Sequence, residues 1–185
     1  MRDLSAARRP PLIATTPMLR PMPPATRHIL RGGREARVAA GKVLGFDLPA
    51  SACRATCAGD RAALWQGPDE WLLLSTAASG DRAQAPLNEA SLEEALQGLP
   101  HSLVNVSHRQ IGLELRGLHA ALLLAAGCPL DLEAGAFPVG MCTRTVLAKA
   151  EVVLWRTDPQ LFRLEVWRSF AAYVAAFLAE SARGL

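Results

Sequence analysis

The chain has 185 residues, of which 50% are hydrophobic and 20% are charged, and its formal net charge is +3. These values are typical of a globular protein that can bury a full core. The basic residues are scattered, which argues against nucleic acid as a partner. The longest apolar run, residues 170–179, is about half of what a membrane-spanning helix needs, so we expect no membrane contact.

The four cysteines, Cys53, Cys57, Cys128 and Cys142, have neither the spacing of a zinc knuckle nor paired histidines beside them. We therefore expect no metal site and interpret them as small buried side chains in a reducing compartment. The N-terminal segment lacks the apolar stretch of a secretory signal. The sequence thus predicts a cytoplasmic protein.

Residues 1–25 differ from the rest of the chain because they contain six prolines and four arginines. Proline cannot donate a backbone hydrogen bond, so the segment is predicted to be an extended or disordered N-terminal arm. Two interpretations stay open: a solvated tail, or an arm that wraps along a partner.

Residues 26–107 are predicted to form a first half in the order strand, helix, strand, strand, helix, strand. Gly45 is a natural helix C-cap, and Ser91 opens a sequence of the capping-box form. The segment Gly67-Pro-Asp-Glu70 predicts a type I turn within a hairpin. The expected strands are 27–31, 62–66, 71–75 and 103–107, and the expected helices are 35–44 and 91–99.

Residues 108–185 nearly repeat this order. The expected strands are 110–116, 143–149, 151–155 and 162–167, the expected helices are 118–126 and 169–182, and 128–140 is a loop. The repetition predicts an α+β fold made of two β-α-β-β-α-β-type units, with antiparallel-rich sheets and helices on one face. The domain at 26–185 would then consist of two similar halves.

A four-residue turn at 157–160 would place Trp155 opposite Phe162 on a core-like face. Arg163, Glu165 and Trp167 would share the other face. A large aromatic side chain among charged neighbours is typical of an interface hot spot, so Trp167 is a candidate partner contact.

Ser107 and His108 are the pair most suggestive of nucleophilic catalysis. Adjacent residues of a strand point to opposite faces, and a catalytic serine usually lies on a strained turn that this sequence lacks. We therefore expect no catalytic residue and no cofactor-binding residue in this chain.

The connection from Cys128 to Arg144 is long, and it is rich in apolar side chains. Loops of this length in compact domains are usually functional or disordered, and this one is too apolar for comfortable disorder. Phe137, Met141 and Arg144 are therefore predicted partner-interface residues, although covering the chain's own core stays open. The alanines of helix 169–182 fit either close partner contact or plain helix propensity.

Several motifs together resemble a known family. They are Gly67-Pro-Asp-Glu-Trp-Leu-Leu-Leu74, Val106-Ser-His-Arg-Gln-Ile-Gly112, Cys128-Pro-Leu-Asp-Leu132, Phe137-Pro-Val-Gly-Met-Cys-Thr-Arg144 and Leu164-Glu-Val-Trp-Arg-Ser-Phe170. In this order they resemble gamma subunits of heterotetrameric sarcosine oxidase, within the aminomethyltransferase (glycine cleavage T-protein) superfamily. The resemblance covers the chain from about residue 27 to its C-terminus.

The resemblance implies an aminomethyltransferase-like fold and a structural, non-catalytic role. The enzyme would be a flavin-dependent oxidase that demethylates sarcosine and passes the one-carbon unit to tetrahydrofolate. The expected partners are the alpha, beta and delta subunits. FAD, FMN and NAD would belong to the complex, with no cofactor in this chain, which would be part of an enzyme only through the complex.

One departure from the superfamily pattern bears on the alternative function. Folate transferases carry an Asp-Asp pair before a strand, and this sequence has Ala150-Glu151 at the matching place. The alternative is a stand-alone folate-binding one-carbon transferase-like protein that uses Glu151 as its acid or base. On the expected strand pairing, Glu151 lies on the core-like face.

Overall fold

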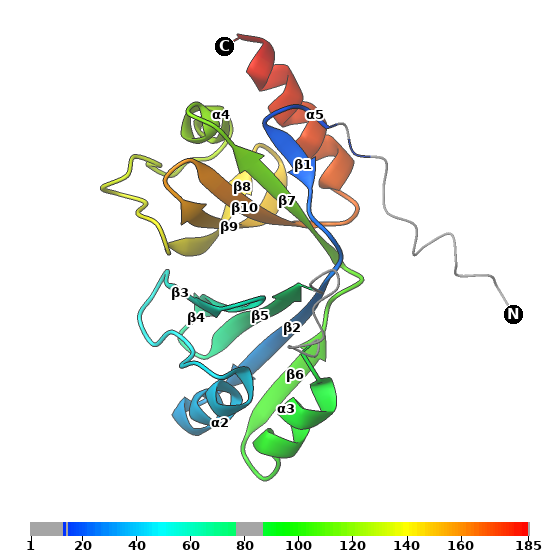
Figure 1. Cartoon of the computed structure of the whole chain (residues 1–185), viewed down its shortest axis with the longest axis vertical. Coiled ribbons are helices and arrows are strands. Elements are labelled where there is room, and N and C mark those ends of the chain that lie inside the picture. Colours follow the sequence, from blue (N-terminus) through cyan, green and yellow to red (C-terminus); the bar gives the residue numbers. More distant parts are fainter. Residues whose placement is uncertain (1–12, 14, 77–86, 185) are drawn as a thin grey trace, which may run out of the picture.

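The computed structural model describes residues 13, 15–76 and 87–184. Within them the chain forms two five-stranded sheets in which every paired strand is antiparallel. Sheet A has the order β1-β7-β10-β9-β8 and sheet B the order β3-β4-β5-β2-β6 (Figure 1). The strands are β1 Leu19–Pro21, β2 Ala25–Gly32, β3 Ala55–Ala58, β4 Arg61–Gly67, β5 Glu70–Thr76, β6 His101–Asn105, β7 Gln110–Arg116, β8 Cys142–Leu147, β9 Ala150–Asp158 and β10 Leu161–Trp167.

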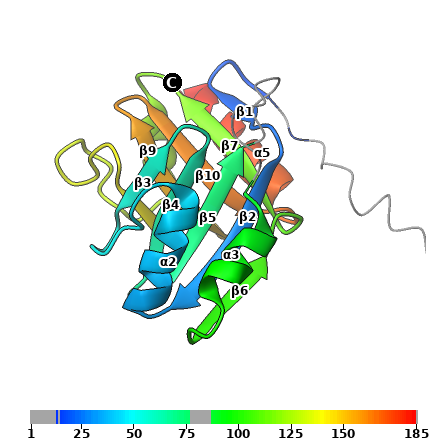
Figure 2. The same ribbon diagram turned by 60° about the horizontal axis from the view of Figure 1, so that its bottom comes forward.

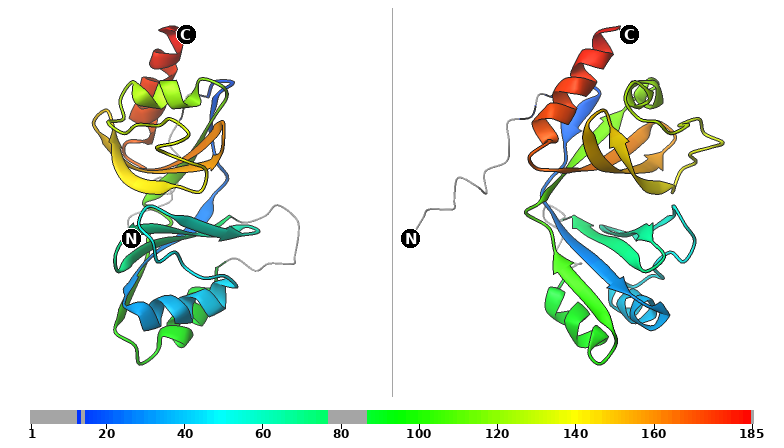
Figure 3. Two further views of the ribbon diagram at one scale, coloured as in Figure 1. Left: turned by 90° about the vertical axis from the view of Figure 1, so that its left-hand side faces the viewer. Right: turned by 180° about the vertical axis from the view of Figure 1, so that it is seen from behind.

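The two sheets lie face to face between two layers of helices (Figures 1 and 3). Helices α4 (Ala120–Ala125) and α5 (Ala171–Ser181) cover sheet A, and a short 3-10 helix, Ala182–Gly184, follows α5. Helices α2 (Arg34–Leu44) and α3 (Glu89–Leu96) cover sheet B, as Figure 2 shows from the side of these helices. Three buried clusters result: one between each sheet and its helices, and one between the sheets.

The two sheets repeat one topology. Strands β2, β3, β4 and β5 correspond in order to β7, β8, β9 and β10, and helices α2 and α3 correspond to α4 and α5. The strand that β6 supplies at the edge of sheet B is supplied in sheet A by β1, from the N-terminal side of the chain. All five strands of sheet B therefore lie within residues 25–105, whereas sheet A takes its edge strand from the segment that precedes β2.

The edge strand of sheet A comes from the predicted N-terminal arm. Residues 19–21 belong to the predicted N-terminal arm, yet they pair with β7, and Leu19 is buried in the core of sheet A. Residues 1–12 and 14 of that arm lie outside the described residues. Two backbone hydrogen bonds, Met22 N to Gly112 O and Val106 N to Arg27 O, both 2.8 Å, join the two chain segments that cross between the sheets.

Several local details differ from the expectations. Helix α2 ends as expected, with Gly45 in the left-handed conformation at φ 85°. Helix α3 begins earlier than expected, because the Asn88 side chain accepts a hydrogen bond from the Ala90 N–H and caps the helix in place of Ser91. Helix α5 begins at Ala171 instead of residue 169, and its N-cap position, Phe170, has no side-chain cap.

The predicted register of β9 against β10 is wrong by one residue. An irregularity at Leu161/Phe162 places Phe162 opposite Arg156 and Arg163 opposite Trp155. Trp155 therefore faces sheet B, in the inter-sheet cluster, whereas Phe162 faces the helices of sheet A. Both faces of these strands are buried, so hydrophobic alternation could not set the register.

Candidate partner interface and inter-sheet contacts

Phe137 lies in the core of the chain and not at its surface. Its side chain is 1% exposed, and its ring centroid lies 6.3 Å from that of Phe162. The prediction of Phe137 as a partner contact is therefore wrong: the connection 128–140 folds over its own sheet, which was the alternative left open.

Arg156 holds this connection in place. Its guanidinium donates hydrogen bonds to the carbonyl oxygens of Leu132, Phe137 and Pro159 at 3.1, 2.9 and 2.6 Å. It also lies over the ring of Phe162, 5.0 Å from the ring centroid. The side chain is buried and meets no carboxylate among the residues that the structure describes. Its charge is instead stabilised by backbone dipoles, and the carbonyls of an irregular segment gain donors that they would otherwise lack.

The other three predicted interface residues are accessible to different degrees. Met141 is partly buried and packs against the same core as Phe137. Arg144, on β8, has a side chain that is 43% exposed and pairs with Glu70 at 2.6 Å. Trp167, at the end of β10, is 37% exposed, and the guanidinium carbon of Arg109 lies 4.2 Å from its ring centroid. Arg144 and Trp167 remain available to a partner.

Ser107 has a structural role in the fold. Its hydroxyl accepts a hydrogen bond from the Arg27 N–H at 2.9 Å and lies 3.4 Å from the Arg27 carbonyl oxygen, to which it donates. The hydroxyl thus fastens the connection between β6 and β7 to strand β2. Ser107 and His108 lie in the turn between β6 and β7 and not in a strand, so the expected strand geometry does not apply to them.

A buried ionic cluster between the sheets was missed by the sequence analysis. Glu165 accepts hydrogen bonds from Arg27 Nε at 2.6 Å and from Arg163 Nε at 2.7 Å, and all three side chains are buried. Arg163 Nη2 also lies 2.7 Å from the carboxylate, but without hydrogen-bond geometry. Gly112 makes room for the cluster, because a Cβ there would lie 3.3 Å from atoms of both Arg27 and Glu165. The sequence offered two partial signals, a glycine within a strand and the shared strand face of Arg163 and Glu165, but none for Arg27.

The cysteines differ in environment more than expected. Cys128 and Cys142 are buried, as predicted, whereas Cys57 is exposed and Cys53 partly exposed. Burial raises the pKa of the Cys142 thiol to about 12. The sulfur lies 3.2 Å from the Arg54 carbonyl oxygen, to which the thiol donates, and this contact joins β8 to the segment before β3.

The outer surfaces of the two helix layers differ in charge. Around α2 and α3 the chain carries Arg34, Glu35, Arg37, Lys42, Glu89, Glu93 and Glu94. Residues 117–130 and 169–179, which include α4 and most of α5, contain no Asp, Glu, Lys or Arg. Their exposed apolar side chains include Leu118 (79% exposed), Leu122 (56% exposed), Phe170 and Tyr173. We call this outer surface the α4–α5 face.

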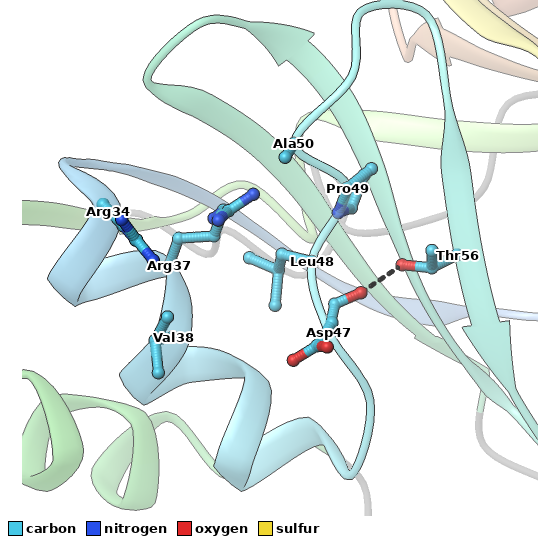
Figure 4. Close-up of a pocket in the computed structure, with 8 residues that line it drawn as sticks. All are labelled: Arg34, Arg37, Val38, Asp47, Leu48, Pro49, Ala50 and Thr56. Carbon is cyan, nitrogen blue, oxygen red and sulfur yellow. Dashed lines mark hydrogen bonds between the residues drawn. The ribbon is translucent and has the colours of Figure 1, made fainter.

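A hollow also lies between α2 and the segment that follows it (Figure 4). Arg34 and Arg37 extend from the helix beside Leu48 and Pro49, and Thr56 donates a hydrogen bond to the Asp47 carbonyl oxygen at 2.8 Å. The hollow has a volume of about 380 Å³ and opens to solvent. Its geometry brings no nucleophile or general base into contact with another reactive side chain.

The described residues form neither a metal-binding cluster nor a membrane-spanning helix. Within 13, 15–76 and 87–184, no three His, Cys, Asp or Glu side chains gather as they would around a metal ion. Over the same ranges, no helix has the length and apolar character needed to cross a membrane.

Comparison of the sequence with known proteins identifies its relatives. Residues 34–183 match the family model described as "Sarcosine oxidase, gamma subunit family". The chain is 36% identical over 129 residues to sarcosine oxidase subunit gamma of Arthrobacter sp, which covers 69% of this chain and 60% of the relative. It is 33% identical over 152 residues to the subunit of the same name from Corynebacterium sp. (strain U-96), covering 80% and 70%. The chain thus spans less than two thirds of the Arthrobacter relative.

Solved structures agree with these matches. A chain of heterotetrameric sarcosine oxidase from Corynebacterium sp. U-96, in complex with pyrrole 2-carboxylate, superposes with a TM-score of 0.77 at 31% identity, covering 88% of this chain and 82% of that one. Glycine cleavage system aminomethyltransferase T from Bartonella henselae superposes with a TM-score of 0.63 at 14% identity, covering 89% and 46%. The second likeness concerns the fold, which is aminomethyltransferase-like α+β as predicted. The chain belongs to the sarcosine oxidase gamma subunit family.

Proposed function

We propose that this chain is a non-catalytic assembly subunit of a flavin-dependent heterotetrameric sarcosine oxidase. The complex would demethylate sarcosine, or a related N-methyl amine, and pass the one-carbon unit to tetrahydrofolate. FAD, FMN and NAD would be bound by the other subunits, of the alpha, beta and delta types. Support comes from the family membership and from the heterotetrameric relative of known structure.

The α4–α5 face is the observation that carries the proposal. The corresponding helices α2 and α3 cover sheet B in the same way, and of the seven charged residues around them six are exposed and Arg37 is half-buried. Because α2 and α3 hold the corresponding positions, they indicate how many charged side chains a helix layer of this fold carries when it faces water. Large exposed apolar patches that lack charge are typical of protein–protein interfaces. The α4–α5 face therefore fits a surface that is covered in the assembled enzyme.

Two local features support a non-catalytic role. The hydroxyl of Ser107 is engaged with the backbone of Arg27 and is not paired with a base. Glu151 stands alone where folate transferases have two adjacent acids, because residue 150 is alanine. Glu151 lies on the same face of β9 as the buried Val153 and Trp155, but its own side chain is exposed.

Charge placed on the α4–α5 face tests the assembly role. We expect the double variant Leu122→Glu/Tyr173→Glu, co-expressed with the other subunits, to be lost from the purified complex, because two charges would have to be desolvated at the interface. Val38→Glu is the matched control, since Val38 is an exposed apolar residue on α2. Retention of the double variant at wild-type stoichiometry would refute the proposed docking face.

The alternative, a stand-alone folate-binding one-carbon transferase, has its own test. Calorimetry of the full-length chain with tetrahydrofolate should give no binding heat if the chain acts only within the assembly. Binding that is abolished by Glu151→Gln would favour the alternative instead.

A further inference from the structure

A cleft between the two sheets, away from the α4–α5 face, brings together several polar groups. It has a volume of about 260 Å³. Its apolar wall comes from both sheets and from the connection between them: Ile29, Leu72, Val104, Val106 and Val153. Its polar side chains are Arg31, Gln66, Glu70, Arg109, Gln110, Arg144 and Glu151.

Two amide oxygens in this cleft are buried without a hydrogen-bond donor. They are Oε1 of Gln66 and Oε1 of Gln110, and Gln110 as a whole is only 7% exposed. The orientation of the Gln66 amide is fixed, because its Nε2 donates to the Trp65 carbonyl oxygen at 3.1 Å. Buried acceptors are nearly always paired in folded proteins. Two unpaired acceptors on residues that line one cleft are suited to a molecule with N–H groups.

The charges in the cleft indicate the rest of that molecule. Arg31 is paired with Asp69, and Arg144 with Glu70. Arg109 is different: it stacks on Trp167 and meets no carboxylate in the part of the chain that the structure describes. Glu151 is exposed and, over the same residues, has no cationic partner. The cleft therefore offers one uncommitted cation and one uncommitted anion.

We propose that this cleft binds a small aliphatic α-amino acid as its zwitterion. The ammonium N–H groups donate to the oxygens of Gln66 and Gln110, with Glu151 compensating the positive charge. The carboxylate pairs with Arg109, whose guanidinium is held by the Trp167 ring. The aliphatic side chain contacts the apolar wall. The cleft is smaller than the usual pocket for a drug-sized ligand, which restricts the occupant to a small molecule.

Calorimetry on the full-length chain with L-valine tests this proposal independently of assembly. We expect saturable binding with a Kd of about 1 mM or tighter. N,N,N-trimethylvaline keeps both charges but has no N–H group, and L-valinamide lacks the carboxylate. Both should bind at least about tenfold more weakly. Equal affinity for valine and its trimethyl form would overturn the assignment of the amide oxygens, and absence of valine binding would leave water as their partner and overturn the proposal.

Variants locate the binding in the cleft. Arg109→Gln and Gln110→Leu should each weaken valine binding by about tenfold or more, while Arg109→Lys should restore part of the loss. Arg31→Gln is the matched control, because Arg31 lines the same cleft but is already paired with Asp69. Circular dichroism separates loss of binding from loss of fold. Unchanged affinity in Arg109→Gln, or an equal loss in Arg31→Gln, would contradict the proposed contacts.

Discussion

Arg156→Met is expected to destabilise the chain strongly. Methionine keeps an unbranched side chain of similar reach but has no N–H donor, so the carbonyl oxygens of Leu132, Phe137 and Pro159 all lose their donor. The bonds to Leu132 and Phe137 are buried, whereas the bond to Pro159 is only partly buried.

The magnitude follows from these three contacts. A hydrogen bond that involves a charged group contributes about 1.5–3 kcal/mol, and a buried group left unpaired costs a similar amount. The three contributions are not additive, because the Pro159 carbonyl can take up water and the segment 128–140 can relax. We therefore expect a loss of about 3–5 kcal/mol in the free energy of unfolding, a large share of the roughly 5–15 kcal/mol of a typical domain.

Urea denaturation followed by tryptophan fluorescence and far-UV circular dichroism measures this loss. For an m-value of about 2 kcal/mol per molar, the midpoint should fall by about 2 M. Arg144→Met is the matched control: its ion pair with Glu70 lies at the surface and should contribute less than about 1 kcal/mol. The urea midpoint of Arg156→Lys should lie between those of wild type and Arg156→Met. This variant still allows a measurement if Arg156→Met does not fold. A midpoint for Arg156→Met equal to that of Arg144→Met would refute the conclusion that Arg156 stabilises the segment 128–140.

Three further expectations follow from the packing. Phe137→Ala should lower the free energy of unfolding by about 3–5 kcal/mol in urea denaturation, because the ring is buried in the core. A loss below about 1 kcal/mol would contradict this burial. Iodoacetamide at pH 8 should label Cys57 and leave Cys142 unmodified until denaturant is added. Burial raises the pKa of Cys142 to about 12, so its side chain stays an unreactive thiol. Rapid labelling of Cys142 in the folded chain would contradict this expectation. Gly112→Ala should lower the thermal midpoint, because the added Cβ crowds the buried Arg–Glu cluster and lowers the free energy of unfolding by about 1–3 kcal/mol. Gly135→Ala should leave the midpoint unchanged, because a Cβ there meets nothing within 4 Å. Equal midpoints for the two variants would mean that the cluster adjusts freely.

The elements with clear periodicity were predictable from the sequence. Strand β7, Gln110–Arg116, has the bounds that its period-two alternation predicts, and α2 ends at Gly45 as its cap residue predicts. Strand β3, Ala55–Ala58, was missed because it is short and built of small residues with little strand preference. Strand β1 was missed because the prolines around it resemble a disordered tail, whereas a proline at the end of an edge strand is compatible with pairing.

Burial was harder to predict than secondary structure. The apolar side chains of 128–140 fit a core-covering loop and an interface equally well. The burial of Phe137 and the contacts of Arg156 decide between the two. A buried arginine that binds carbonyl oxygens leaves no pattern in the sequence. The shared face of Arg163, Glu165 and Trp167 was predicted, but its partner Arg27 comes from the other sheet, and a single sequence contains no signal for that pairing.

Hydroxyl-radical footprinting of the chain alone and in the assembled oxidase tests the central claim most directly. It measures the solvent access of individual side chains, so it reports on the α4–α5 face without any substitution. We expect oxidation of Leu122, Phe170 and Tyr173 to fall sharply on assembly, while oxidation of Val38 on the charged α2 layer stays unchanged. Unchanged oxidation of the α4–α5 face in the complex, with Val38 protected instead, would contradict the account.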